Sequence, residues 1–178
     1  HGVGYSQMTR RGRWRGSTAQ TYLREARGRP NLRVETNAQG GKLMFEGRRC
    51  VGVTFQRDGK LTEVRANREV IVSGGAVNSP HILQISGIGP AAHLQSLGIP
   101  VVHDLPGVGA NLIDHYVVRV VHRVKGAETV NEVSRFPRVL PELLRFAFTG
   151  RGALTFGVTT AQVFCDSREG LASPDLQL

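Results

Sequence analysis

Cysteine is scarce in this sequence. Its two cysteines, Cys50 and Cys165, stand far apart in a chain of 178 residues and form no C-x-x-C pair. Disulfide-stapled domains and zinc ribbons need several closely spaced cysteines, so both classes are excluded. The two thiols are best interpreted as small core residues of a protein in a reducing compartment. We therefore expect a cytoplasmic location, with a peripheral position at a membrane as the other option.

Motifs for metal binding and for serine hydrolysis are also missing. The six histidines include no H-E-x-x-H pair and no close ligand spacing, so no metal site is expected. No G-x-S-x-G sequence is present, which excludes the nucleophile elbow of the α/β-hydrolases. The adjacent Asp114 and His115 fit an oriented general base. They also fit a pair that braces a turn, which is the commoner role of such a pair.

A long stretch of the chain has no formal charge. Residues 70–103 contain no Asp, Glu, Lys or Arg, and this length could span a bilayer. Glycine, proline, asparagine and glutamine interrupt the stretch every few residues, and a helix in lipid would leave their polar groups without partners. The stretch therefore predicts a buried strand, a turn and two short helices, and no transmembrane segment.

Acidic residues are scarce at the start of the chain. Residues 1–34 hold eight arginines and one acid, Glu25, and carry +7 of the total net charge of +9. Such a segment is typical either of a nucleic-acid-binding arm or of a solvated face beside an enzyme site. Because glycines and a proline interrupt the segment, one long amphipathic presequence helix is disfavoured.

Local signals predict a mixed α/β chain. A capping-box pattern, S-x-x-Q at residues 17–20, predicts a helix that runs to about Arg27. The tetrapeptide at residues 57–60, Arg-Asp-Gly-Lys, predicts a hairpin turn between two strands. After His115 the pattern changes, and residues 117–124 predict a strand. A helix is expected over residues 141–148, with its three large apolar side chains facing inward.

The first functional signal follows a short apolar run. Val70–Val72 is typical of a strand that is buried on both faces of a parallel sheet. Gly74-Gly75-Ala76 then leaves the strand end almost without side chains, so a ligand or another backbone can approach closely. Asn78 or Ser79 is expected to cap the next helix, with Pro80 at its first position. Glycine 87 is expected to end this helix, and a second helix is expected from residue 90 to 97.

Residues 87–92, Gly-Ile-Gly-Pro-Ala-Ala, fit the G-x-G-x-x-A dinucleotide fingerprint in letters. That motif works between a strand and a helix, where backbone N–H groups meet a pyrophosphate. Here a predicted helix precedes the motif, and Pro90 lacks an N–H donor. A phosphate role is therefore not favoured. The residues alone indicate part of an α/β domain with a candidate site for a nucleotide-like ligand.

Residues 75–89, Gly-Ala-Val-Asn-Ser-Pro-His-Ile-Leu-Gln-Ile-Ser-Gly-Ile-Gly, resemble the second signature of the glucose-methanol-choline (GMC) flavin oxidoreductases. Residues 105–115, Leu-Pro-Gly-Val-Gly-Ala-Asn-Leu-Ile-Asp-His, are similar to the PGVGxNLxDH run of that family. Residues 17–23 and 31–36 resemble the stretch that precedes the signature, and residues 150–154 also match. The resemblance covers nearly the whole chain and is nearest to the choline dehydrogenase-like branch.

The resemblance implies a fold and a cofactor. Residues 1–115 would form the middle part of a Rossmann-like FAD/NAD(P)-binding domain of the α/β class. Residues 116–178 would begin an α+β substrate domain with an antiparallel sheet. FAD is the implied cofactor, with Gly74, Gly75 and Ala76 close to it. The main chain of Gly40, at a position where valine is common, would meet the adenine.

The resemblance also implies a reaction, the oxidation of choline or another primary alcohol by hydride transfer to flavin N5. The enzyme would be a dehydrogenase or an oxidase with a small-molecule alcohol as its partner, and no nucleic acid. Both ends of the chain look cut, so the family's G-x-G-x-x-G is expected before His1 and its catalytic histidine beyond Leu178. No residue here receives a catalytic role, and the chain alone is expected neither to hold FAD tightly nor to turn over substrate.

Two alternatives stay open. One is a basic nucleic-acid-binding module that uses residues 1–34. The other is a non-catalytic truncated relative that keeps the fold and serves as an interaction protein.

Overall fold

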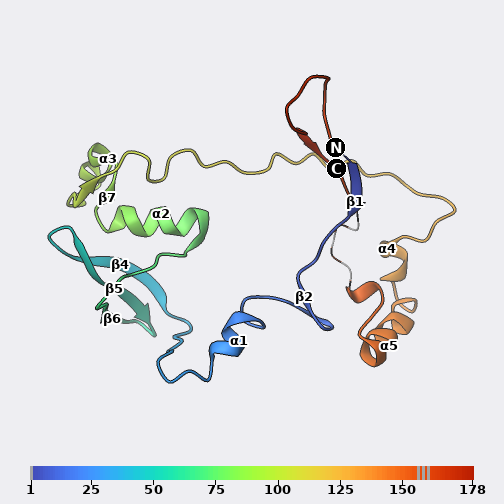
Figure 1. Ribbon diagram of the computed structural model, residues 1–178, viewed down its shortest axis with the longest axis horizontal. Coiled ribbons are helices and arrows are strands. Elements are labelled where there is room, and N and C mark those ends of the chain that lie inside the picture. The colour runs from blue at the N-terminus through green and yellow to red at the C-terminus, as the bar shows by residue number, and fades with distance from the viewer. Residues whose placement is uncertain (1, 156, 158, 160) are drawn as a thin grey trace. The chain divides into compact units, whose positions relative to one another are not determined.

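The structure is a computed structural model that describes residues 2–155, 157, 159 and 161–178 (Figure 1). The chain forms two compact units. One unit is Val34–Arg119, and the other combines the residues up to Arg33 with Val120–Leu178. No helix in the described part of the chain is long and apolar enough to cross a membrane.

The unit Val34–Arg119 is built around an antiparallel meander of β4 (Gln39–Glu46), β5 (Arg49–Arg57) and β6 (Lys60–Arg65), in that order. The predicted hairpin turn is confirmed, since Arg57 pairs with Lys60 across it. Asp58 and Gly59 have φ angles of 50° and 75°. Such left-handed values suit the tight two-residue turns that match the twist of paired strands.

Strand β4 contains a local irregularity. Gly40 and Gly41 both lie inside β4, where the register shifts between Gly40 and Leu43. A Cβ on Gly41 would lie 2.5 Å from Thr54 Oγ1. That hydroxyl accepts a hydrogen bond from the Lys42 N–H at 2.9 Å. The glycine therefore allows the side chain of β5 to fill the bulge in β4.

Helix α2 (Gly75–Ile85) starts earlier than the sequence predicted. Gly74 is its N-cap, and Pro80 lies inside the helix rather than at its first position. Gly75 has φ 84°, a conformation that glycine adopts easily. Because Gly75 can adopt this conformation, the helix begins before the proline. Pro80 has no backbone N–H, so the helix lacks one hydrogen-bond donor at that position. Gly87 follows the helix with φ 88°, as expected for a helix end.

The run Val70–Val72 does not form the predicted strand. Ile71 is 77% exposed, and the run pairs with no strand in the part of the chain that the structure describes. A strand buried on both faces needs neighbouring strands and covering helices. The described residues of this unit place none beside it, so the apolar run stays in the connection to α2.

A small parallel crossover follows α2. Strand β7 (Ile88–Gly89) pairs with β8 (His103–Asp104), and α3 (Ala91–Ser96) connects them. The helix expected at residues 90–97 is confirmed. Leu94 of α3 is fully buried, so this side chain is the core of the crossover.

The second unit contains a three-stranded antiparallel sheet in the order β1-β9-β10. Its strands are β1 (Gly2–Tyr5), β9 (Ala161–Cys165) and β10 (Leu176–Gln177). The other elements are β2 (Arg10–Arg11), β3 (Trp14–Arg15), α1 (Tyr22–Ala26), α4 (Val130–Val133), α5 (Val139–Thr149) and a 3₁₀ turn at Ala153–Thr155.

The hairpin β2–β3 packs against the carboxyl end of α5. Trp14 meets Phe146 edge-on with ring centroids 6.0 Å apart. Arg13 donates to the Ala147 carbonyl at 2.9 Å, and Arg10 donates to the Gly150 carbonyl at 3.4 Å. Cations are favoured at a helix carboxyl end, where the last carbonyls lack partners within the helix. These arginines of the basic segment therefore stabilise the fold of this unit.

Three predictions in this unit need correction. Helix α1 spans only Tyr22–Ala26 and has no side-chain cap, because Ser17 contributes its backbone carbonyl instead of its hydroxyl. Residues 117–124, at the junction of the two units, form no strand. Helix α5 is confirmed, but Leu143, Leu144 and Phe148 are 44%, 59% and 82% exposed rather than inward. The described residues of the unit supply no layer that would cover them.

Candidate functional site

Helix α2 and the sheet β4–β6 line an open cavity of about 470 Å³. Ligand pockets commonly have volumes of ~300–1,000 Å³. Gly40 lines the cavity from the sheet, and Gly74 lines it from the start of the helix. The structure thus brings together two predicted cofactor-binding residues that stand 34 positions apart in sequence. The full lining consists of Gln39, Gly40, Gly41, Gln56, Leu61, Gly74, Asn78, His81, Ile82 and Ile85.

The wall at Gly40 has room for a ligand. A Cβ at this position would meet only the tip of Ile82, at 3.8 Å from Cδ1. Gly40 is exposed, and β4 is an edge strand. An edge strand presents backbone N–H and C=O groups to any partner that reaches it. The main chain at Gly40 can therefore contact a planar, hydrogen-bonding group such as a purine.

The wall at Gly74 is the amino end of α2. No side chain caps this end, and the first turn has no acidic residue. The first N–H groups of a helix and its dipole favour an anion such as a phosphate. Gly75 opens the helix and is exposed. Both walls fit the chemistry of FAD, which carries an adenine and a diphosphate.

Ala76 lies on the other side of the helix from this cavity. It lines a second cavity of about 510 Å³ between α2 and the loop at residues 109–113. Of the four predicted cofactor-binding residues, the structure thus places Gly40 and Gly74 at one cavity and Ala76 at the other.

Two polar residues of the site escaped the sequence analysis. Asn78 and His81 line the first cavity, and His81 also lines the second. Their spacing is a signal that could have found them, because residues three or four apart share a helix face. Positions 78, 81, 82 and 85 face one cavity, and positions 77, 80, 81 and 84 face the other.

Two side chains fix α2 in place. The Ser86 hydroxyl, in a residue only 8% exposed, accepts a hydrogen bond from the Leu43 N–H at 2.8 Å. It donates to the Ile82 carbonyl at 2.5 Å. On the opposite side, Gln84 Nε2 donates to the Val108 carbonyl at 3.0 Å. The helix is therefore tied to β4 and to the loop that follows β8.

The G-x-G-x-x-A letters at residues 87–92 do not form a phosphate site. Asp104 Oδ1 accepts a hydrogen bond from the Ala91 N–H at 2.9 Å. A carboxylate of the chain itself thus occupies the amino end of α3, where a phosphate would otherwise bind. Helix α2 ends at Ile85, directly before the motif, as predicted, and the two-residue strand β7 lies within the motif.

The Asp114–His115 pair makes one local contact and lies in a segment without a turn. Asp114 Oδ1 accepts a hydrogen bond from the backbone N–H of His115 at 2.7 Å, so this contact does not orient the imidazole. In the described part of the chain, no group of three His, Cys, Asp or Glu residues could hold a metal ion. Cys50 and Cys165 are free and half-buried.

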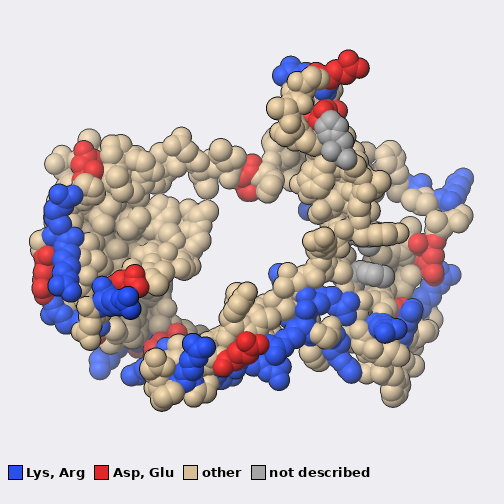
Figure 2. Space-filling model, in the orientation of Figure 1, with Lys and Arg blue, Asp and Glu red and all other residues tan. Residues whose placement is uncertain are grey.

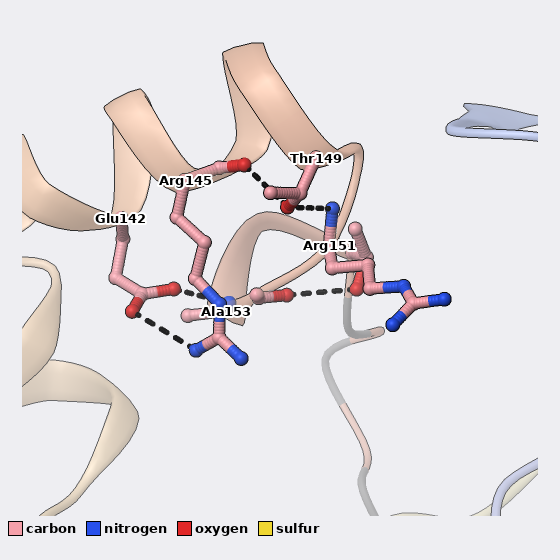
Figure 3. A network of polar contacts seen from close by, with 7 residues as sticks. Glu142, Arg145, Thr149, Arg151 and Ala153 are labelled. Atoms are coloured by element: carbon pink, nitrogen blue, oxygen red, sulfur yellow. Dashed lines mark hydrogen bonds and ion pairs between the residues drawn. The ribbon is translucent and has the colours of Figure 1, made fainter.

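The other unit has a larger cavity and a polar network, neither of which involves the predicted residues. The cavity measures about 670 Å³ and is lined chiefly by residues of β1 and β9. The network holds the glycine-rich turn after α5 (Figure 3). Glu142 accepts a hydrogen bond from the Ala153 N–H at 2.7 Å and pairs with Arg145 at 3.6 Å. Thr149 Oγ1 accepts from the Arg151 N–H at 3.2 Å. All of these partners are internal, so the network is a structural one.

Comparisons with known proteins identify relatives of the whole chain. A family model described as GMC oxidoreductase matches residues 1–117. The oxygen-dependent choline dehydrogenase of Pectobacterium carotovorum is 42% identical over 96% of this chain and 30% of its own length. The mitochondrial choline dehydrogenase of Mus musculus is 41% identical over 99% of this chain and 30% of its own length.

Among solved structures, a FAD-dependent oxidoreductase from Chaetomium thermophilum matches with a TM-score of 0.77 at 27% identity, over 92% of this chain and 30% of that one. The chain thus spans about 30% of the length of the relatives that it matches. Mixed helices and antiparallel sheets, together with this neighbour, confirm the expected α/β class of a FAD-binding fold.

Proposed function

Because the chain belongs to the GMC oxidoreductase family, whose cofactor is FAD, we propose that it supplies the adenosine-binding part of a FAD-dependent alcohol oxidoreductase. The observation that carries this proposal is the cavity shared by Gly40 and Gly74. The main chain of Gly40 would contact the adenine, and the amino end of α2 would face the diphosphate. Gly75 would lie close to the cofactor at the same helix start. Ala76, which lines the second cavity, would approach the cofactor only from the other side of α2.

The proposed reaction is the oxidation of a primary alcohol, with choline as the leading substrate because two relatives carry that name. When bound, FAD supplies the hydride acceptor, its N5 atom, while a base takes the hydroxyl proton, so that the alcohol becomes an aldehyde. We assign no residue of this chain to that base. The role proposed for the chain's own residues is to bind and orient the adenosine end of the cofactor.

We further propose residues 1–115 as part of the FAD-binding domain and residues 116–178 as the start of a substrate domain. The Gly40–Gly74 cavity lies within the first range and supports its assignment. The sheet of the second range also includes Gly2–Tyr5, so the structure groups the start of the chain with the proposed substrate domain. A cytoplasmic location is supported by the free thiols of Cys50 and Cys165.

Nucleic-acid binding by residues 1–34 receives little support. Arg10 and Arg13 donate to carbonyls of α5 and the turn after it, and Arg11 pairs with Glu25 at 3.0 Å. Lys and Arg side chains also gather over the sheet β4–β6 (Figure 2). Basic side chains thus also occur outside residues 1–34, although the net positive charge is concentrated in that segment.

The test is a titration of the chain with FAD, followed by fluorescence anisotropy, in which the wild type should give weak but saturable binding. Gly74→Val places a side chain whose Cβ would lie 3.1 Å from Asn78 Cβ, and we expect it to weaken FAD binding about tenfold. Gly40→Val is the matched control, because its Cβ has room and the proposed contact is made by the backbone. We expect its affinity for FAD to stay within about threefold of the wild type.

The absence of saturable binding by the wild type would contradict the proposal. So would equal losses in the two variants, provided that thermal unfolding shows both to be folded. For the reaction, the coding DNA should be read beyond both ends of this segment. A G-x-G-x-x-G strand–turn–helix upstream and a histidine with a His or Asn partner downstream are the expected finding, and their absence from a continuous reading frame would contradict the enzymatic proposal.

A further inference from the structure

We propose that Ser86 is the positioning residue of the cofactor cavity, setting the separation between its two walls. This inference rests on the proposed function, since it concerns the same cavity between α2 and β4. The residue lies at the end of α2, outside the residues that line the cavity. Its action would therefore pass through the elements that it joins.

The Ser86 hydroxyl contacts the unpaired edge of the sheet β4–β6. Strand β4 is an edge strand, so its outward backbone groups have no strand partner and need another one. Leu43 is buried, and its N–H donates to Ser86 Oγ at 2.8 Å. The hydroxyl of α2 thus takes the place of a strand at this point of the edge.

The Ser86 hydroxyl makes two hydrogen bonds that link the end of α2 to β4. The Ser86 hydroxyl also donates to the Ile82 carbonyl at 2.5 Å, so its single hydrogen is committed and its lone pair faces Leu43. Ile82 is the side chain that meets the Cβ position of Gly40. The Ser86 hydroxyl therefore fixes both the end of α2 and Ile82, the residue whose side chain lies against Gly40 in the cavity.

Loss of the Ser86 hydroxyl would have an energetic cost at the buried Leu43 N–H. Ser86 is a buried polar residue at 8% exposure, and replacing it with alanine would leave the Leu43 N–H without an acceptor in a buried position. The helix and the sheet could then separate in the free protein. Cofactor binding would have to restore their spacing, and a site that must be ordered on binding loses affinity.

The experiment compares the wild type with Ser86→Ala, Ser86→Thr and Ser96→Ala. Ser96 is an exposed serine whose hydroxyl also donates to a helix carbonyl, at 2.8 Å, so its replacement controls for loss of a serine near a helix end. Each protein is titrated with FAD, ADP and FMN at a temperature where unfolding curves show it to be folded. Exchange of the Leu43 amide is followed in parallel by NMR.

We expect Ser86→Ala to raise the Kd for FAD and for ADP by about tenfold, with faster Leu43 exchange. FMN lacks the adenosine end, so we expect no saturable FMN binding by any of the proteins. Ser86→Thr keeps the hydroxyl and should restore both FAD affinity and Leu43 protection, and Ser96→Ala should match the wild type. A loss of FAD and ADP affinity in Ser96→Ala equal to that in Ser86→Ala would indicate general destabilisation and overturn the inference.

The outcomes separate the two proposals. If the wild type binds FAD and ADP, while Ser86→Ala binds them equally well, the positioning role is wrong and the proposed function stands. If the wild type binds neither ligand, the proposed function fails, and the role of Ser86 in that site fails with it.

Discussion

At the scale of single residues, close backbone approaches decide where glycine is required. Gly52 in β5 faces the carbonyl oxygen of Val64 in β6, and a Cβ on Gly52 would overlap that oxygen and lie 3.1 Å from the Arg65 Cα. Both neighbours are backbone atoms, so neither can move without distorting the sheet. We expect Gly52→Ala to lower the free energy of unfolding by about 1–3 kcal/mol in urea titrations.

Gly107 provides the control for this prediction in the same unit. A Cβ there would meet no atom within 4 Å, and its φ angle is not left-handed. Gly107→Ala should therefore change the free energy of unfolding by less than about 0.5 kcal/mol. Similar losses in the two variants would show that glycine flexibility, and not the approach of β6, explains the effect.

At the scale of elements, a capping box at the start of α4 makes the helix sensitive to acid. Hydrogen bonds from the backbone N–H and the hydroxyl of Thr129 lower the pKa of Glu132 below its ordinary value of 4.5. A carboxyl whose pKa is lower in the folded state stabilises that state above its ordinary pKa, and the contribution disappears as the pH falls through the folded value. We therefore expect the amides of α4 to lose protection from exchange as the pH falls below 4.5.

The measurement is an NMR titration of the Glu132 carboxyl together with amide exchange across Val130–Val133. Glu132→Gln keeps an acceptor but cannot titrate, so the acid-dependent part of the exchange should vanish. Glu128→Gln removes a nearby carboxyl outside the capping box and should leave that dependence in place. A Glu132 titration midpoint at or above 4.5 would contradict the role of the capping box.

Capping boxes also show how far sequence patterns reach. The S-x-x-Q pattern at residues 17–20 predicted a side-chain cap that does not form. The T-x-x-E pattern from Thr129 to Glu132 was not singled out, and it does form. Both patterns have the right letters, but a carboxylate is a stronger acceptor than an amide oxygen. The turn at Asp58-Gly59 was predictable because its φ angles depend on those two residues alone.

At the scale of the whole molecule, predictions failed where a segment needs partners distant in sequence. Val70–Val72 has the composition of a buried strand, but in the described part of the chain no strand pairs with it. The proposed cofactor cavity shows the same limit. Gly40 and Gly74, which the family resemblance implies to lie near FAD, both line it. Asn78 and His81 line it too, but their place there depends on how α2 meets the sheet, and the Ser86 contact to β4 depends on the same packing.

The exposure of the residues around the proposed cofactor cavity predicts weak binding of FAD. Gly40, Gly74 and Ala76 are exposed, and Val77 on α2 is 67% exposed. A tight ligand site usually buries ~70–90% of its ligand, and one helix beside one sheet cannot cover a dinucleotide to that extent. We expect the purified 178-residue chain to lose FAD during gel filtration, although excess FAD binds reversibly. Flavin absorbance that stays with the protein peak would show that the described walls suffice for tight binding. The cofactor would then have to lie deeper between α2 and the sheet than the exposure of these residues indicates.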